Sequence, residues 1–175
     1  GGGDAPVDVS ADLRILYDDD NLYLGLKVTN NKGMVNKNHE YEIFNGDCLE
    51  VYFNGDPATT FKKRGVVKWI NSDDKFILAP TSINGKPVVI QQGIGVVTDK
   101  VKIAVKEEKN GYIMEAAIPR TILRANNWKT GDKLRFEAAI TDSDKEGSYR
   151  SKIYWSSESR RAWSNPDLWG VAEIK

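Results

Sequence analysis

The sequence offers few side chains for nucleophilic chemistry. Its 175 residues include one histidine, His39, and one cysteine, Cys48. A Ser-His-Asp or Cys-His centre would have to be built on His39, which lies in the polar stretch 36–40 that is typical of a solvated loop. A single thiol excludes an internal disulfide and any zinc site made of several thiolates. We therefore expect no catalytic residue, and the lone cysteine does not fix the compartment.

Carboxylates are abundant, with 25 Asp and Glu residues. None stands in a recognisable pair of the kind that cleaves a glycosidic bond. Two clusters, Asp18-Asp19-Asp20-Asn21 and Asp142-Ser143-Asp144, would supply several oxygens to a calcium ion. Neither has EF-hand spacing, and acidic turns in water are the competing interpretation, because Asp and Asn favour turns. A structural calcium ion is the one metal cofactor that the sequence leaves open.

Aromatic side chains are the remaining candidates for ligand contact. Trp163 precedes the loop formers Ser164-Asn165-Pro166, so its ring reaches the surface unless it folds back onto the domain. The other four tryptophans are expected mainly to pack, because large rings dominate cores, although one of them, Trp69, would also suit a binding face. These four are Trp69, Trp128, Trp155 and Trp169.

The elements that must position these residues are β-strands. Apolar and polar residues alternate, for example over 22–28 and 48–53, which predicts strands with one buried and one wetter face. Turn signals such as Asn84-Gly85 and Asn110-Gly111 separate the strands. Strands are expected at 13–17, 22–28, 48–53, 65–71, 75–79, 86–92, 101–106, 112–118, 134–140, 150–156 and 168–174.

Only one helical segment is expected, at 120–125, where Pro119 suits the start of a helix. Many short strands with one short helix predict an all-β fold, a two-sheet antiparallel β-sandwich. We expect a single domain over residues 4–175, and Gly1-Gly2-Gly3 to be a cloning remnant or a disordered end.

Composition excludes several classes of protein. Lys and Arg number 25, equal to Asp and Glu, so the formal net charge is zero. This balance argues against a nucleic-acid partner, which calls for a basic surface. With 40% hydrophobic residues the chain is not of the disordered type. No apolar run approaches the roughly 20 residues of a membrane span, so no membrane partner is expected.

Three segments, in this order, resemble family 9 carbohydrate-binding modules. The likeness is fairly specific because it extends from about Asp12 to Lys175. The segments are 21–29 with the strand 46–53 of the family's D-x-x-E-v-x-f type, 111–119 followed by Gly131 and 134–136, and 163–170 with the family's W-x-x-P-x-x-[FW]-G ending.

The resemblance implies a sandwich that binds sugars without cleaving them, by clamping a terminal sugar between two aromatic rings. The C–H face of a pyranose stacks on an aromatic face and buries apolar area. Trp163 matches the second clamp residue. Phe44 falls at the first, six residues before Glu50, where the family usually has tryptophan, and Tyr41 is a rival for that role.

The resemblance also implies polar groups that hold the sugar hydroxyls through charge-assisted hydrogen bonds. Glu50 matches such a residue, points away from the core and shares its strand face with Tyr52, a further candidate. Asp47 is expected to fix the preceding loop through backbone N–H groups. Three polar positions of the family are replaced, and Arg160 and Arg161 are expected to donate to the hydroxyls instead. The replaced positions are Ile77, Ala79 and Ala139.

The resemblance further implies the wider context. We expect a monomeric module for cellulose- or xylan-derived sugars, attached to a catalytic domain of a secreted bacterial glycoside hydrolase or to a surface protein. The alternative is a related sandwich that has lost sugar binding and mediates protein contacts or carries haem. Haem would need axial ligands, for which His39 with Met34 or Met114 is the only pair available.

Overall fold

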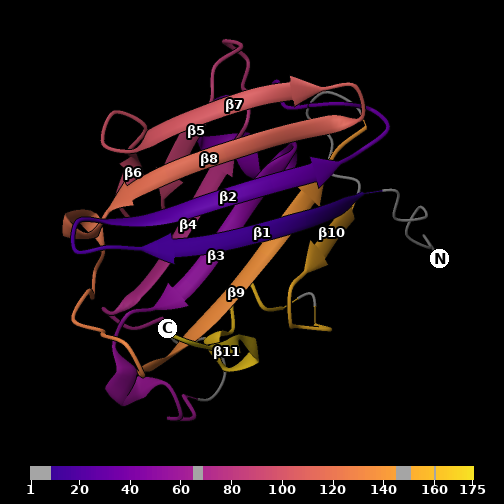
Figure 1. Ribbon diagram of the computed structural model, residues 1–175. Coiled ribbons are helices and arrows are strands. Elements are labelled where there is room, and N and C mark those ends of the chain that lie inside the picture. Colours follow the sequence, from indigo (N-terminus) through magenta and orange to yellow (C-terminus); the bar gives the residue numbers. More distant parts are fainter. Residues whose placement is uncertain (1–8, 65–68, 145–150, 160) are drawn as a thin grey trace.

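Two antiparallel β-sheets face each other across an apolar core in the computed structural model of the chain (Figure 1). The structure describes residues 9–64, 69–144, 151–159 and 161–175. The expectation for Gly1-Gly2-Gly3 lies outside these residues. The strands are β1 (Ser10–Tyr17), β2 (Asn21–Thr29), β3 (Cys48–Asn54), β4 (Asp73–Ala79), β5 (Val88–Gln91), β6 (Gly95–Val96), β7 (Lys102–Glu108), β8 (Gly111–Pro119), β9 (Lys133–Asp142), β10 (Ser151–Tyr154) and β11 (Gly170–Glu173).

The smaller sheet has four strands in the order β1-β2-β8-β7 and lies in front of the larger sheet in Figure 1. The larger sheet has seven strands, in the order β10-β9-β3-β4-β5-β6 with β11 paired to β9. The β-sandwich predicted from the sequence is therefore confirmed. Among the described residues, every strand pair is antiparallel.

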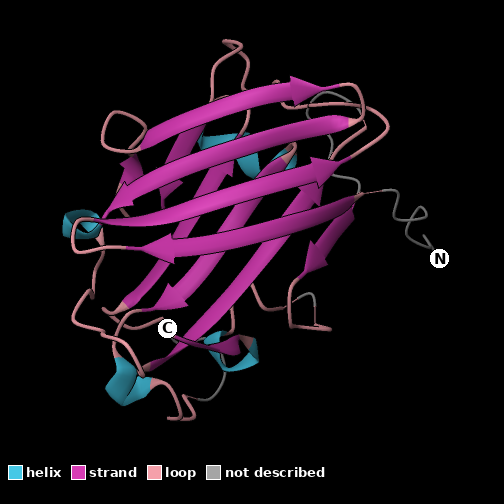
Figure 2. Cartoon of the chain, in the orientation of Figure 1, coloured by secondary structure: helices cyan, strands magenta, loops and turns pink. Residues whose placement is uncertain are grey.

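Helical structure in the described residues consists of short 3₁₀ turns among long strands (Figure 2). The helix predicted at 120–125 is a 3₁₀ turn of three residues, because Leu123 already has extended dihedral angles. Three further turns were not predicted. The turns are η1 (Glu40–Asn45), η2 (Pro57–Thr59), η3 (Arg120–Ile122) and η4 (Pro166–Leu168). No helix of the described residues is long and apolar enough to cross a membrane.

The expected strand 65–71 is not matched where the structure describes it. Residues 69–71 do not belong to a strand, and 65–68 lie outside the described residues. Trp69 instead packs edge-on against Trp169, with ring centroids 5.3 Å apart. The short strand β6 was missed, because two residues are too few to show alternation.

The core between the sheets is built from the apolar residues that alternate along the strands. Leu24 and Leu26 of β2, with Met114 of the neighbouring β8, share one buried cluster with Val51 of the opposite sheet. On the smaller sheet the opposite positions are wetter, as the alternation predicts, and Lys27 is exposed. The inter-sheet cluster contains Val9, Leu22, Leu24, Leu26, Val28, Leu49, Val51, Phe53, Phe76, Leu78, Val89, Val97, Val101, Tyr112, Met114, Ala116, Ile118, Leu123, Trp128, Leu134, Ala138 and Ile140.

The larger sheet departs from the expectation of one wet face. Every residue of β3 and of β4 is buried, on both faces. Two further apolar clusters lie on the outer face, each closed by a loop. One consists of Ile43, Cys48, Ile77, Ala79, Val88 and Ile90, and the other of Tyr52, Ala139, Ala162 and Trp169 with Trp69, Tyr154 and Leu168 against them.

Two of the other tryptophans differ in their burial. Trp128 is buried, stacks edge-on with Tyr17 and lies under the Arg120 guanidinium at 4.2 Å, so it covers η3 as predicted. Trp155 was predicted to pack in a strand, but β10 ends at Tyr154 and the Trp155 ring is 57% exposed. Its one aromatic contact is the edge of Phe136, at 5.5 Å.

We expect Trp169→Ala to lower the free energy of unfolding by about 3–5 kcal/mol, because it empties a fully closed site. Trp169 is 2% exposed, contacts Tyr52 and donates Nε1–H to the carbonyl of Ala162 at 2.8 Å. Urea unfolding followed by fluorescence measures the loss. Trp155→Ala is the matched control, for which only about 0.5–1.5 kcal/mol is expected from its single aromatic pair. Equal losses in the two variants would contradict the burial difference.

Candidate functional site

A first loop covers one part of the outer face of the larger sheet. We call residues 36–47, which include η1, the η1 cover. Ile43 is fully buried against Cys48 and Ile77. The side chain of Asn36 holds the turn, because its amide donates to the carbonyl oxygens of Ile43 at 2.8 Å and Asp47 at 3.1 Å. The η1 cover is therefore fixed to the sheet by both apolar and polar contacts.

Asp47 ties this cover to the neighbouring strands. Its carboxylate accepts hydrogen bonds from the backbone N–H groups of Val35 and Ser143, both at 2.8 Å. This confirms the prediction that Asp47 fixes the loop before its strand. Burial raises the pKa of Asp47 to about 7, against the lowering effect of these two donors and with a further rise from Asp142.

A second loop covers another part of the same face. We call the described residues of 155–169 the C-terminal cover. Trp169 and Ala162 are buried over Tyr52 and Ala139. The Asn165 side chain accepts from the Asp167 N–H at 3.1 Å and caps η4. The C-terminal cover is therefore held to the sheet by apolar contacts, and the Asn165 cap stabilises its turn.

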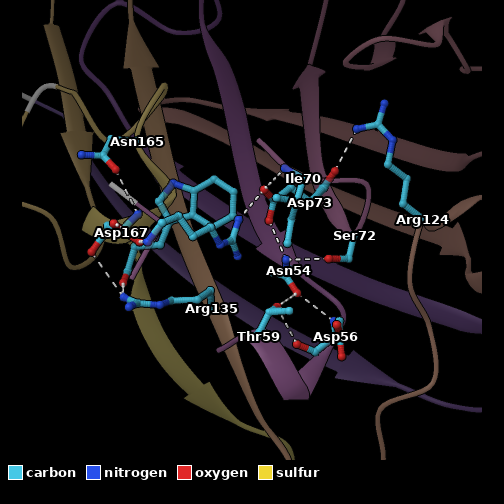
Figure 3. A network of polar contacts seen from close by, with 12 residues as sticks. Asn54, Asp56, Thr59, Ile70, Ser72, Asp73, Arg124, Arg135, Asn165 and Asp167 are labelled. Carbon is cyan, nitrogen blue, oxygen red and sulfur yellow. Dashed lines mark hydrogen bonds and ion pairs between the residues drawn. The ribbon is translucent and has the colours of Figure 1, made fainter. Parts of the chain in front are cut away.

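Arg135 of β9 anchors the end of the C-terminal cover. Its guanidinium donates to the carbonyl oxygen of Asp167 at 3.3 Å (Figure 3). It also donates to the carbonyl oxygen of Trp169 at 2.8 Å, and its Nε donates to that of Thr60 at 2.7 Å. Carbonyl groups that would otherwise lack partners in the loop are thereby satisfied. The chain leading away from Trp163 is consequently tied to the sheet.

The loop after β3 belongs to the same network. The Asn54 amide donates to the Asp73 carboxylate at 2.6 Å and to Ser72 at 2.9 Å (Figure 3). Arg64 pairs with Asp73 through its side chain and donates its backbone N–H to the Asp167 carboxylate at 3.0 Å. The loop after β3 and the C-terminal cover therefore support one another.

Between the two covers lies an ionic cluster that we call the Glu50 triad. It consists of Glu50 of β3, Lys75 of β4 and Lys152 of β10. Lys152 Nζ lies 2.7 Å from one carboxylate oxygen of Glu50, and Lys75 Nζ lies 3.1 Å from the other. The Tyr52 hydroxyl also donates to Glu50, and the Lys75 ammonium lies 5.2 Å from the centre of the Tyr52 ring.

Glu50 is 1% exposed and ionised. Burial raises the pKa of Glu50, but the ammonium groups of Lys75 and Lys152 outweigh burial, so that the pKa lies below its ordinary value. The sequence placed Glu50 on the correct strand face. It did not predict that this face would be covered, or that two lysines would take up the carboxylate.

Two exposed aromatic rings, predicted as the clamp, stand on the two covers. Phe44, at the end of η1, is 43% exposed, and Trp163, on the C-terminal cover, is 54% exposed. Tyr41, the rival to Phe44, is 71% exposed on the same turn. Cys48 lies under the η1 cover, Tyr52 under the C-terminal cover, and Glu50 between them on β3. The two covers that carry the exposed rings therefore lie on either side of Glu50.

The remaining predicted site residues fall in different places. Tyr52 has no exposed surface, so the structure assigns it to holding Glu50 and not to direct contact with a ligand. Arg161, two residues before Trp163 in the sequence, is exposed. Arg160 lies outside the described residues. Lys75 and Lys152 were missed, although period-2 alternation places Lys75 on the same strand face as Ile77.

The positions that replace polar residues of the family lie beside the triad. Ile77 pairs with Glu50 from β4, and Ala139 pairs with it from β9. Ala79 lies two residues after Ile77 on β4, in the apolar cluster under Ile43. The polar groups beside Ile77 and Ala139 therefore include those of the triad.

The other candidate chemistry does not assemble. Burial raises the pKa of the Cys48 thiol to about 12, which leaves it unreactive. His39 is exposed before η1, whereas Met114 is buried between the sheets, as its alternation predicts. Asp18 forms an ordinary turn, and the hydrogen bonds from Tyr23 and the backbone lower its pKa. The described residues contain no group of three or more His, Cys, Asp or Glu arranged for a metal, so calcium stays a prediction.

The fold is a β-sandwich in which two loops cover the outer face of the larger sheet, and each loop presents an exposed aromatic ring. The sequence model of the carbohydrate family 9 binding domain-like family matches residues 3–175. The chain belongs to this family. The resemblance inferred from the three sequence segments is thereby confirmed.

Individual relatives agree with this assignment. The chain is 26% identical over 169 residues to endo-1,4-beta-xylanase A of Thermotoga neapolitana, covering 96% of this chain but 14% of that enzyme. A family 9 carbohydrate-binding module from Caldicellulosiruptor kristjanssonii, solved with cellotriose, superposes with a TM-score of 0.70 at 18% identity, over 98% of this chain and 77% of that one. The same module with glucose gives 0.70 at 19% identity, over 98% and 79%. At these identities the solved structures show the shared fold.

We expect the stability conferred by Asp47 to depend on pH. Its pKa is about 7 in the folded protein and about 4 when unfolded. Folding therefore takes up a proton between these values, and the contribution is largest below pH 4 and is lost as the pH rises through 7. Asp47→Asn removes the titrating carboxyl group and with it this dependence of stability on pH. It also removes one of the two oxygens that accept a backbone N–H.

Urea unfolding at pH 5 and pH 8 measures the difference between wild type and Asp47→Asn. We expect the free energy of unfolding of the wild type to exceed that of Asp47→Asn by more at pH 5 than at pH 8. Burial also raises the pKa of Asp74, but Asp74 is common to both proteins and cancels in the comparison. A difference that does not change with pH would show that Asp47 stays ionised in the folded state.

Proposed function

We propose that this domain binds a carbohydrate without cleaving it, through an aromatic clamp formed by Phe44 and Trp163. The observation that carries the proposal is the position of these two exposed rings on separate covers either side of the Glu50 triad. Both rings are large apolar surfaces held on anchored loops, and such surfaces mark binding sites. Family membership supports the same conclusion.

The two kinds of group in this site have separate roles in the proposal. The rings bury the C–H faces of a pyranose and supply most of the affinity. Lys75 and Lys152 direct N–H groups at its oxygens, with Arg161 at the rim. Glu50 acts through the lysines, because it holds both ammonium groups in place.

The wider setting is also part of the proposal. The chain spans about one seventh of the curated relative that it matches, an endo-1,4-beta-xylanase. We place the domain as a monomeric module attached to a catalytic domain that degrades plant polysaccharide, in a bacterial extracellular enzyme or surface protein. Cellulose- and xylan-derived oligosaccharides are the first ligands to test. A module of this kind holds the enzyme near its substrate and raises the local concentration of that substrate.

Calorimetry against cellobiose, xylobiose, glucose and their reduced alditols tests the proposal. Binding of at least one sugar is expected, and loss of binding on reduction would indicate recognition of the reducing end. If none of them bound, and hydrolysis were absent too, the alternative of a sandwich that serves protein contacts would stand.

We expect Trp163→Ala to weaken sugar binding by ~1–3 kcal/mol, as the loss of one large stacking contact predicts. This is roughly a ten- to hundredfold rise in the dissociation constant. The melting temperature should hardly change, because the ring is 54% exposed. Calorimetry and a thermal melt on the same sample measure both quantities.

Phe44→Ala should weaken binding in the same way, and Trp155→Ala is the matched control. Trp155 is an equally exposed tryptophan, at 57%, but its aromatic contact is with Phe136 of β9. It should leave the affinity unchanged. A Trp163→Ala protein that unfolds, or that binds the sugar as the wild type does, would make Trp163 a plug at the end of the sandwich.

A further inference from the structure

The Glu50 carboxylate has little capacity left for a ligand. A carboxylate offers about four lone-pair positions. Three are occupied within the protein, by Lys152 on one oxygen and by Lys75 and the Tyr52 hydroxyl on the other. The carboxylate is also 1% exposed. A sugar hydroxyl therefore meets almost no acceptor at this position.

Donors, by contrast, remain in excess. Each ammonium group has three N–H donors, and the polar contact of both Lys75 and Lys152 is with Glu50. Their side chains are 10% and 14% exposed, so neither is completely closed off from solvent. The free hydrogen-bonding capacity at the base of the clamp is accordingly of the donor type.

The triad itself has an excess of positive charge. One carboxylate faces two ammonium groups, which gives these three side chains a charge of one positive unit. Of the other buried acids on this sheet face, Asp73 has a cationic partner and Glu137 has uncharged partners among the described residues. Glu137 accepts from Ser156 Oγ at 2.7 Å and from the Ser156 N–H at 3.0 Å, and Asp73 pairs with Arg64.

The surroundings increase the effect of this charge. Ile77 and Ala139, both buried, are the cross-strand neighbours of Glu50. Charges interact more strongly among apolar groups than in water. A neutral sugar would satisfy the ammonium N–H groups but leave the charge unbalanced, whereas a carboxylate would satisfy both.

We propose that the site prefers a sugar that carries a carboxylate, a uronic acid, whose anionic group binds Lys75 and Lys152 while its ring lies between Phe44 and Trp163. This inference rests on the proposed carbohydrate-binding function and specifies its ligand class. Arg161, which is exposed and precedes Trp163 by two residues, would add a positive group at the rim.

The test uses sugars that differ at one carbon atom. Glucuronic acid is compared with glucose, and galacturonic acid with galactose, by calorimetry at low and at high salt. The acid of at least one pair should bind about tenfold more tightly at low salt, the equivalent of one additional charge-assisted hydrogen bond. The advantage should shrink as salt is added.

Lys152→Met locates the effect. It removes one ammonium group and leaves Glu50 paired with Lys75, and the ratio of acid to neutral affinity should collapse toward one. Lys106→Met is the matched control, since Lys106 is 75% exposed on the smaller sheet and pairs with Glu108; its ratio should equal that of the wild type. Thermal melts verify that both variants are folded.

Each outcome decides between the two proposals. Neutral sugars that bind as tightly as their acids would overturn the preference for uronic acids and leave the carbohydrate-binding function intact. If the Lys152→Met variant still preferred acidic sugars, the preference would arise from the rim and not from the triad. That result would also overturn the inference. If neither neutral nor acidic sugars bound, both proposals would fall.

Discussion

The arrangement of the larger sheet depends on one buried carboxylate. Glu50 lies on the covered face of the larger sheet between two apolar clusters, and it is ionised there because two ammonium groups and a phenol hydroxyl surround it. A buried charge is tolerated only with such partners, and removal of one of them is strongly destabilising. The three strands that supply the triad, β3, β4 and β10, are thereby held in one relative position.

That constraint explains why the exposed rings stand where they do. The η1 cover closes the sheet on one side of Glu50 and the C-terminal cover closes it on the other. Each cover buries an apolar anchor, Ile43 or Trp169, and leaves an aromatic ring at its surface, Phe44 or Trp163. The buried anchor and the exposed ring of each loop are therefore different residues, so that substitution of a ring does not require disruption of an anchor.

The sequence predicted the sheets well, because period-2 alternation reports directly which side chains share a face. Leu49 and Val51 were correctly assigned inward, and Glu50 outward. The covers were not predicted, since alternation says which face a residue occupies and nothing about the loops that close over it. The signal was present in Cys48 and Ile77, which are apolar at positions that were expected to be wet.

Lys75 and Lys152 were missed for a related reason. The resemblance supplied positions at which the family has polar groups, and at those positions this chain has Ile77 and Ala139. The polar groups come from the pairs next to them, a displacement that becomes visible only when strands distant in sequence are placed in register. Lys152 lies 102 residues after Glu50, yet the two are in direct contact.

The single thiol of this fold can be used to measure local opening. Cys48 is fully buried beneath Ile43, and its pKa is about 12. A thiol reagent can reach it only while the η1 cover is lifted from the sheet, because the reactive thiolate must be exposed to form. Alkylation kinetics under native conditions therefore report the opening free energy of this one loop, separately from global unfolding. The loop that carries Phe44 can thus be followed through a cysteine that the protein already contains.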